Sequence, residues 1–215
     1  LVAALKELRI KPVLLAPTGR AAKVLARYCG EQALTIHKRI YRQRTNADYE
    51  SKFSLDFNRE QGAVFIVDEA SMLSDSTGDG ALFGSGSLLE DLVSYVRSGR
   101  GCRLILVGDS AQLPPVGCDF SPALDPATVS RYGEVVYGLM DEVVRQQMQS
   151  GILFNATLVR CMLENRIYEI PKFEMDYPDF ESVEGGDFME KLQDAFDRYG
   201  RDEVIVITRS NNRAN

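Results

Sequence analysis

Short apolar runs alternate with helix-like segments along the first half of the chain. Continuous apolar runs occur at residues 13–16, 63–67 and 104–107, and each ends in a polar cluster. Runs of this kind are typical of strands in a parallel sheet, which are buried on both faces. Apolar residues at helical spacing predict helices over 1–9 and 20–29. The pattern therefore predicts an α/β layered fold with a mostly parallel sheet and flanking helices.

The second half of the chain repeats this pattern more weakly. Apolar residues four apart, followed by Gly200, predict a helix over 187–199. An apolar run at 203–208 predicts a further strand. Two polar segments, 41–62 and 74–87, have no periodicity, and we interpret them as surface loops or insertions.

The regular pattern breaks near residues 125–140, which predicts a domain boundary there. The chain has 215 residues, of which 45% are hydrophobic and 26% charged, so it is long enough for one large domain or two modest ones. We predict one domain over 1–138 and the beginning of another over 139–215.

Composition excludes several classes of protein. No apolar run approaches the roughly 20 residues that span a membrane, and the N-terminus lacks the layout of a secretory signal. We therefore expect a soluble, cytoplasmic protein without a membrane partner. The four cysteines form no C-x-x-C pair and His37 is the single histidine, which argues against a zinc site.

Charge restricts how the chain can bind nucleic acid. The net charge of −6 argues against a protein that coats nucleic acid with its whole surface. Between residues 20 and 44, however, Lys and Arg outnumber acids strongly, with Glu31 as the one acid. This segment is either a phosphate-contacting face or a solvated helix face, and charge alone does not choose between them.

Two acidic residues follow the second apolar run. The sequence VDEAS at 67–71 places Asp68 and Glu69 at the end of a predicted strand, which is the layout of a Walker B site. In such a site one carboxylate holds Mg²⁺, usually through water, and its neighbour orients or deprotonates the attacking water. We assign Asp68 to the metal and Glu69 to the water. The alternative is an acidic loop after a core strand.

A second polar cluster follows the third apolar run. The sequence GDSAQLPPVG at 108–117 begins at a strand end, so we expect it beside Asp68 and Glu69. Gln112 can hydrogen-bond both a γ-phosphate oxygen and the attacking water, so it can report whether ATP or ADP is bound. The two prolines that follow stiffen the backbone and can pass a shift onward. The alternative is a proline-stiffened turn with no sensing role.

Five short motifs occur in a fixed order along the chain. They are LAPTGRAA at 15–22, TIHK at 35–38, VDEAS at 67–71, GDSAQLPPVG at 108–117 and VRQ at 144–146. In order and rough spacing they resemble motif Ia, the T-I-H element, motif II, motif III and the arginine of motif IV of superfamily 1 DNA helicases of the RecD-like and Dda branch. The SNNRAN ending at 210–215 is similar to a segment of the second motor domain of that family.

The resemblance implies an ATP-dependent DNA helicase with a RecA-like P-loop NTPase fold. Two motor domains would clasp ATP and Mg²⁺ between them and move along single-stranded DNA, 5′ to 3′. Residues 1–138 would be a truncated first motor domain and 139–215 the start of the second. Arg145 would reach the γ-phosphate, where a guanidinium stabilises developing charge and senses domain closure. An ordinary surface arginine is the alternative.

The resemblance also implies a path for DNA. The motif before the predicted helix at 20–29 consists of Pro17, Thr18, Gly19 and Arg20. Backbone N–H groups at a helix start suit a phosphate, and in the family this motif contacts the DNA backbone. His37 matches a position near the DNA, where a neutral imidazole can stack on a base or bond a phosphate. A structural role for His37 is the alternative.

The sequence departs from the family in one important respect. It contains no G-x-x-x-x-G-K-[ST] loop, so the backbone cradle and the lysine that bind the β- and γ-phosphates are absent. Residues 1–9 look like the tail of the helix that follows this loop in relatives, and the later motifs of the second domain are also missing. We therefore interpret the chain as an internal fragment that is inactive alone.

Two other functions stay open at this point. One is a non-catalytic nucleic-acid-binding module derived from a helicase, in which Asp68 and Glu69 are relics. The presence of Gln112 and Arg145 beside them argues against that reading. The other is a motor that drives an exonuclease subunit or a conjugative relaxase, which these residues do not distinguish from a helicase.

Overall fold

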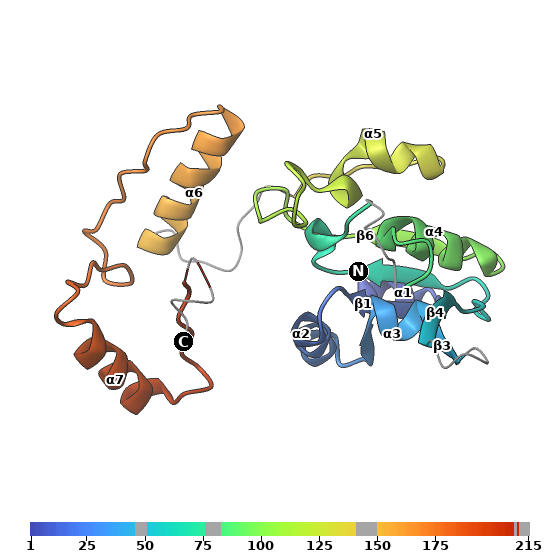
Figure 1. Cartoon of the computed structure of the whole chain (residues 1–215), viewed down its shortest axis with the longest axis horizontal. Helices are drawn as coiled ribbons and strands as arrows, with labels where there is room; N and C mark the ends of the chain where they lie inside the picture. Colours follow the sequence, from blue (N-terminus) through green and yellow to red (C-terminus); the bar gives the residue numbers. More distant parts are fainter. Residues whose placement is uncertain (46–50, 76–82, 141–149, 209, 211–215) are drawn as a thin grey trace. The chain divides into compact units, whose positions relative to one another are not determined.

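The computed structural model of the chain (Figure 1) describes residues 1–45, 51–75, 83–140, 150–208 and 210. The chain divides into two compact units, Leu1–Leu139 and Met140–Asn215. The first unit contains a β-sheet and helices, and the described part of the second contains helices and irregular chain. The assignment of residues 1–138 and 139–215 to two motor domains stays a prediction.

Four parallel strands form the centre of the first unit. They are β1 (Pro12–Ala16), β2 (Ala33–Thr35), β5 (Val64–Val67) and β6 (Arg103–Leu106). Their order in the sheet is β2-β1-β5-β6, and each neighbouring pair is parallel. Because all four strands run the same way, their carboxyl ends lie at one edge of the sheet. The predicted α/β fold with a parallel sheet is confirmed, and β1, β5 and β6 coincide with the three apolar runs that predicted them.

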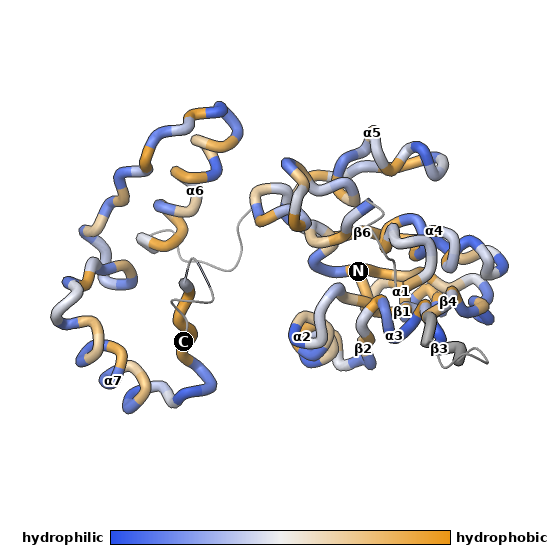
Figure 2. The backbone as a smooth tube through the Cα atoms, in the orientation of Figure 1, coloured by the Kyte–Doolittle hydropathy of each residue, from blue (hydrophilic) through white to orange (hydrophobic). Residues whose placement is uncertain are grey.

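Helices cover both faces of this sheet. The longer ones are α1 (Val2–Glu7), α2 (Gly19–Cys29), α3 (Ile36–Ile40), α4 (Leu88–Ser98) and α5 (Pro126–Val129), and the single turns are η1 (Ala70–Met72), η2 (Pro122–Leu124) and η3 (Ser130–Tyr132). On one face, Leu14 and Ile66 pack with apolar residues of α1 and α2. On the other face, Leu15 and Phe65 pack with residues of α3 and α4. Figure 2 shows hydrophobic positions along the central strands, as expected for a sheet buried on both sides.

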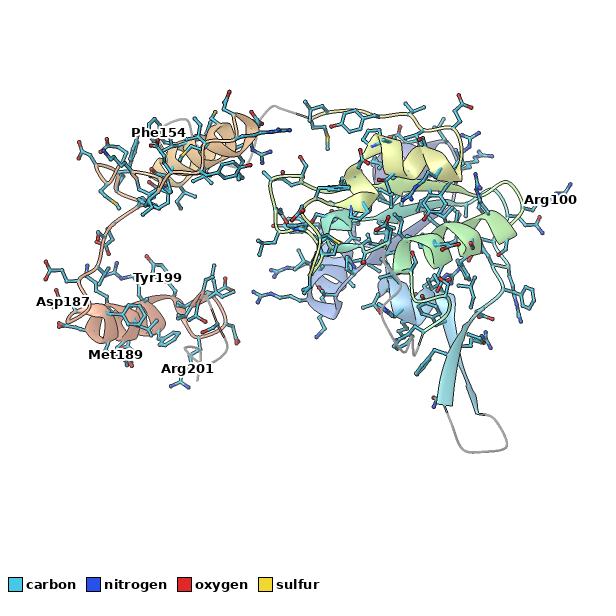
Figure 3. All side chains as sticks on the ribbon, turned by 45° about the horizontal axis from the view of Figure 1, so that its top comes forward. Arg100, Phe154, Asp187, Met189, Tyr199 and Arg201 are labelled. Carbon is cyan, nitrogen blue, oxygen red and sulfur yellow. The ribbon has the colours of Figure 1, made fainter. Side chains whose placement is uncertain are left out.

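A β-hairpin occupies most of the segment predicted as a polar loop. Strands β3 (Tyr41–Thr45) and β4 (Ser51–Leu55) pair in antiparallel register, and Figure 3 shows the hairpin projecting from the rest of the unit. The loop prediction for 41–62 is therefore wrong over these strands. Tyr41, Phe53 and Leu55 of the hairpin pack with the core, but the polar residues around them leave no sustained apolar alternation that predicts two strands. In the segment predicted as a loop at 74–87, the described residues 74–75 and 83–87 form no helix or strand of their own beyond an isolated bridge and the cap of α4.

The second unit contains two helices joined by irregular chain. They are α6 (Gly151–Glu164) and α7 (Phe188–Tyr199), and the latter confirms the helix predicted over 187–199. The strand predicted over 203–208 is wrong, because residues 204–208 have no regular structure. A strand needs a hydrogen-bonded neighbour, and the described part of this unit contains no strand to pair with these residues.

Polar side chains hold the start of α6 against an extended segment. Asp179 accepts hydrogen bonds from the Ser150 hydroxyl at 2.6 Å and from the Gly151 N–H at 2.8 Å. Asn155 is 3% exposed, and its side chain pairs with both backbone groups of Glu174 at 2.8 Å. None of the helices in the described ranges is long and apolar enough to cross a membrane.

Candidate functional site

The predicted functional residues gather at the carboxyl edge of the sheet. Pro17 and Thr18 follow β1, and Gly19 and Arg20 begin α2. His37 lies in α3 directly after β2, and Asp68 and Glu69 follow β5. Gln112 lies in the loop that follows β6. These strands are neighbours in the sheet, so four of the five motifs meet at one edge. This is the edge where α/β proteins with parallel sheets bind their ligands.

Glu69 has a strained backbone that is fixed on both sides. Its φ of +56° and ψ of +38° lie in the left-handed region, which costs a residue with a side chain on the order of 1–3 kcal/mol. The N–H of Asp68 donates to the Leu15 carbonyl at 3.0 Å, and the N–H of Ala70 donates to the Val107 carbonyl at 2.9 Å. Backbone hydrogen bonds to β1 and to the residue after β6 therefore fix the chain on both sides of Glu69.

Gly108 brings the loop after β6 against the Asp68–Glu69 turn. A Cβ atom at this position would lie 3.0 Å from the Ser71 backbone nitrogen and 3.2 Å from that of Ala70. A side chain there would push the two loops apart. The N–H of Val107 also donates to the Val67 carbonyl at 2.8 Å. The structure thus brings the sequences VDEAS and GDSAQLPPVG into direct contact.

A tight turn presents Gln112 at the surface. The Asp109 side chain accepts a hydrogen bond from the Ala111 N–H at 3.0 Å, and the Asp109 carbonyl accepts one from the Gln112 N–H at 3.1 Å. The Gln112 residue is exposed, whereas Pro115 is buried. The turn is therefore anchored at both ends while its glutamine is accessible to a ligand.

The two carboxylates are accessible for a metal ion and a water molecule. Asp68 and Glu69 are half-buried, and in the described part of the chain neither side chain has a hydrogen bond or an ion pair. Asp68 also lines a pocket of about 460 Å³ between α1, α2 and the sheet, beside Ile66 and Val107. This volume is in the range of small-molecule sites.

The residues at this edge include a suitable ligand for Mg²⁺ but lack the loop that binds nucleotide phosphates. Mg²⁺ is usually held by one or two carboxylates, with water and phosphate oxygens completing its shell. Asp68 meets that requirement, although the described residues contain no cluster of three or more His, Cys, Asp or Glu that forms a metal cage. The phosphates themselves have no cradle, because the sequence contains no G-x-x-x-x-G-K-[ST] loop.

The segment predicted to meet DNA forms the start of α2. Thr18 caps this helix, because its hydroxyl accepts the Ala21 N–H at 3.2 Å. Thr18, Gly19 and Arg20 are all exposed, and a Cβ at Gly19 would meet nothing within 4 Å. The backbone at this helix start is therefore open to a phosphate.

His37 packs against aromatic rings at the same edge. Its imidazole lies 5.0 Å from the Phe83 ring in an edge-on arrangement and 5.6 Å from the Tyr41 ring, measured between centroids. Burial lowers the pKa of His37, so the ring is neutral at neutral pH. These contacts give His37 a packing role, and its contact with DNA stays a prediction.

Two predicted features lie outside the described residues. Arg145 is one of them, and the other is the SNNRAN ending apart from Ser210. The sequence did not indicate the roles of Gly108 and Ser71 in the packing of the two loops. The Ser71 hydroxyl is fully buried and has no hydrogen-bond partner among the described residues.

A parallel sheet covered on both faces, with paired carboxylates after an inner strand, defines an α/β domain of the P-loop NTPase type. The chain belongs to the AAA domain family, whose sequence profile matches residues 1–118, more than half of the 215 residues. This family occurs in superfamily 1 helicases, and membership indicates nucleotide binding. No curated protein is significantly similar to the chain.

Proposed function

We propose that this chain is part of an ATP-dependent DNA helicase motor. The observation that carries the proposal is the strained Glu69, held between two strands beside the half-buried Asp68. Strained conformations persist where the surrounding structure fixes them, and they cluster at functional sites. Membership of a family found in superfamily 1 helicases supports the same function.

In this proposal Asp68 and Glu69 have different roles in ATP hydrolysis. Asp68 holds Mg²⁺, which when bound neutralises charge on the β- and γ-phosphates. Glu69 accepts the proton of the water that attacks the γ-phosphate, and its fixed backbone keeps the carboxylate in position. Gln112 hydrogen-bonds the same water and a γ-phosphate oxygen, so the turn that begins at Asp109 responds to hydrolysis.

The remaining assignments follow the motif resemblance. Arg145 stabilises charge at the γ-phosphate and responds to closure of two motor domains. Thr18, Gly19 and Arg20 bind the backbone of single-stranded DNA, and movement is 5′ to 3′. Because the phosphate loop is not among these 215 residues, the chain alone binds ATP weakly and does not unwind DNA.

The substitution Glu69→Gln in the complete gene product tests this function. The amide keeps a hydrogen bond to the water and cannot accept its proton, so we expect nucleotide binding to persist and turnover to fall by roughly 10²-fold or more. Glu134→Gln is the matched control, since Glu134 is exposed and lies away from the site in sequence. Normal turnover in the Glu69→Gln protein would refute the role of Glu69.

The absence of a phosphate loop favours one second candidate function. A nucleic-acid-binding module that no longer hydrolyses ATP would need neither that loop nor Glu69. It would bind single-stranded DNA equally well with and without nucleotide, and Glu69→Gln would change nothing. The same pair of proteins therefore separates the two functions.

A further inference from the structure

Helix α2 carries three cations along one side. Arg20, Lys23 and Arg27 are spaced by three and four residues, which places them within roughly 60° of the helix circumference. All three are exposed, and the helix contains no Asp or Glu. The row begins at the segment proposed to meet DNA and continues for almost the full length of α2.

The packing of α2 directs this basic face away from the sheet. Ala22 is 5% exposed, and Leu25 and Cys29 pack against the sheet residues on the α1 side. These residues occupy the side of the helix opposite the cations. The basic face consequently lies on the surface of the unit.

In the described part of the chain, the three cations of α2 have no counter-charge, in contrast to several cations elsewhere in this unit. Neighbouring cations form ion pairs, namely Lys6 with Glu31, Lys11 and Arg39 with Glu60, and Arg42 with Asp56. Among the residues that the structure describes, Arg20, Lys23 and Arg27 have no such partner. An exposed positive row thus persists on a chain whose net charge is −6.

We infer that this face of α2 binds the phosphate backbone of single-stranded DNA, as an extension of the contact at Thr18 to Arg20. The inference rests on the proposed function. Seven residues separate Arg20 from Arg27, or roughly 10 Å along the helix axis. That length exceeds the distance between neighbouring phosphates of a strand, so the row can meet more than one phosphate. Tyr28, which is 85% exposed, adds a ring on which a base can stack.

Salt-dependent binding of the complete gene product to a labelled oligothymidylate strand tests the inference. In the double variant Lys23→Gln/Arg27→Gln, loss of two phosphate contacts should flatten the slope of log K against log salt by roughly 1.4. Glutamine is a good helix former, so α2 should persist, which circular dichroism checks. The control is Arg100→Gln/Arg103→Gln, which changes two exposed arginines around the amino end of β6, at the other edge of the sheet. Figure 3 labels Arg100, whose side chain points outward.

The variant Arg20→Gln, measured in parallel, separates this inference from the proposed function. If Arg20→Gln and the double variant both flatten the slope and the control does not, the inference is supported. If only Arg20→Gln flattens it, DNA binding stands and the extended contact is refuted, which leaves a solvated face or one that binds an acidic protein. If neither changes the slope, the DNA-binding function itself fails.

Discussion

Glu69 combines a left-handed backbone with a carboxylate that has no partner in the described part of the chain. Strain of this kind lowers stability and is retained where it positions a group for function. The backbone hydrogen bonds of Asp68 and Ala70, which run to two different strands, explain how the strain is held. Stability and catalysis should therefore respond to Glu69 in opposite directions.

The substitution Glu69→Gly should separate these two effects. Glycine adopts a positive φ without steric cost, so the free energy of unfolding should rise by about 1 kcal/mol while ATP turnover is lost. Denaturant unfolding of the variant beside Glu69→Gln measures the difference, since glutamine keeps the strain. If the glycine variant is instead less stable, the left-handed backbone is not a source of strain.

At this scale the sequence predicted the positions of Asp68 and Glu69 better than their backbone geometry. An Asp-Glu pair after an apolar run was enough to place Asp68 and Glu69 at a strand end. Nothing in the residue types indicated the positive φ of Glu69, because that conformation is set by hydrogen bonds to strands distant in sequence. The need for glycine at 108 likewise depends on the approach of the Ala70–Ser71 backbone.

At the scale of single elements, the two sides of α2 differ in residue type and in surroundings. Its apolar side packs on the sheet, its basic side is exposed, and Thr18 and Gly30 define its ends. Gly30 adopts a φ of +61°, as is common at a helix end. The apolar spacing and the glycine were both readable from the sequence, so this helix was predicted with nearly correct bounds.

The stability of the first turn of α6 should depend on pH through Asp179. Hydrogen bonds from the Ser150 hydroxyl and the Gly151 N–H lower the pKa of Asp179 below its ordinary value of 3.8. A lowered pKa in the folded state means that the carboxylate stabilises this helix end above pH 3.8, and that the contribution is lost as the pH falls through the lowered value. Acid should therefore loosen the first turn of α6.

Amide hydrogen exchange in the first turn of α6 measures this effect. Protection of the Phe154 N–H, which donates to the Ser150 carbonyl, should fall on acidification below pH 3.8, after correction for the intrinsic pH dependence of exchange. In Asp179→Asn the protection should be lower and should lose that dependence. Asp187→Asn is the control, because Asp187 begins α7 without a side-chain cap. If the pH dependence of protection at the Phe154 N–H is the same in Asp179→Asn as in the unchanged protein, Asp179 does not cap α6.

The sequence analysis missed elements inside the core as well as outside it, since it predicted no helix at α3 or α4, where Ile36, Ile40 and Leu92 are fully buried. The β3–β4 hairpin was interpreted as a loop because polar residues dominate its sequence, although Tyr41, Phe53 and Leu55 pack with the core. The opposite error occurred at 203–208, where an apolar run predicted a strand. Ile205 and Ile207 are 63% and 85% exposed, so apolar character without a pairing neighbour did not produce a strand.

For the first unit as a whole, the parallel sheet explains why motifs far apart in sequence form one site. Strand order places the ends of β1, β2, β5 and β6 side by side, so segments beginning at residues 17, 36, 68 and 107 meet at one edge. The alternation of strands and helices predicted the parallel sheet and the ends of β1, β5 and β6, whereas it predicted neither β2 nor the strand order. The roles of the residues at that edge depend on ligands and stay as proposals.

The most direct test of the motor function is ATP hydrolysis by the complete gene product, with and without single-stranded DNA. We expect DNA to stimulate turnover severalfold in the unchanged protein, because Arg20, at the start of α2, and Gln112, in the loop after β6, lie at the same edge of one sheet. A protein that binds single-stranded DNA and never hydrolyses ATP would contradict the motor function and establish a binding module in its place.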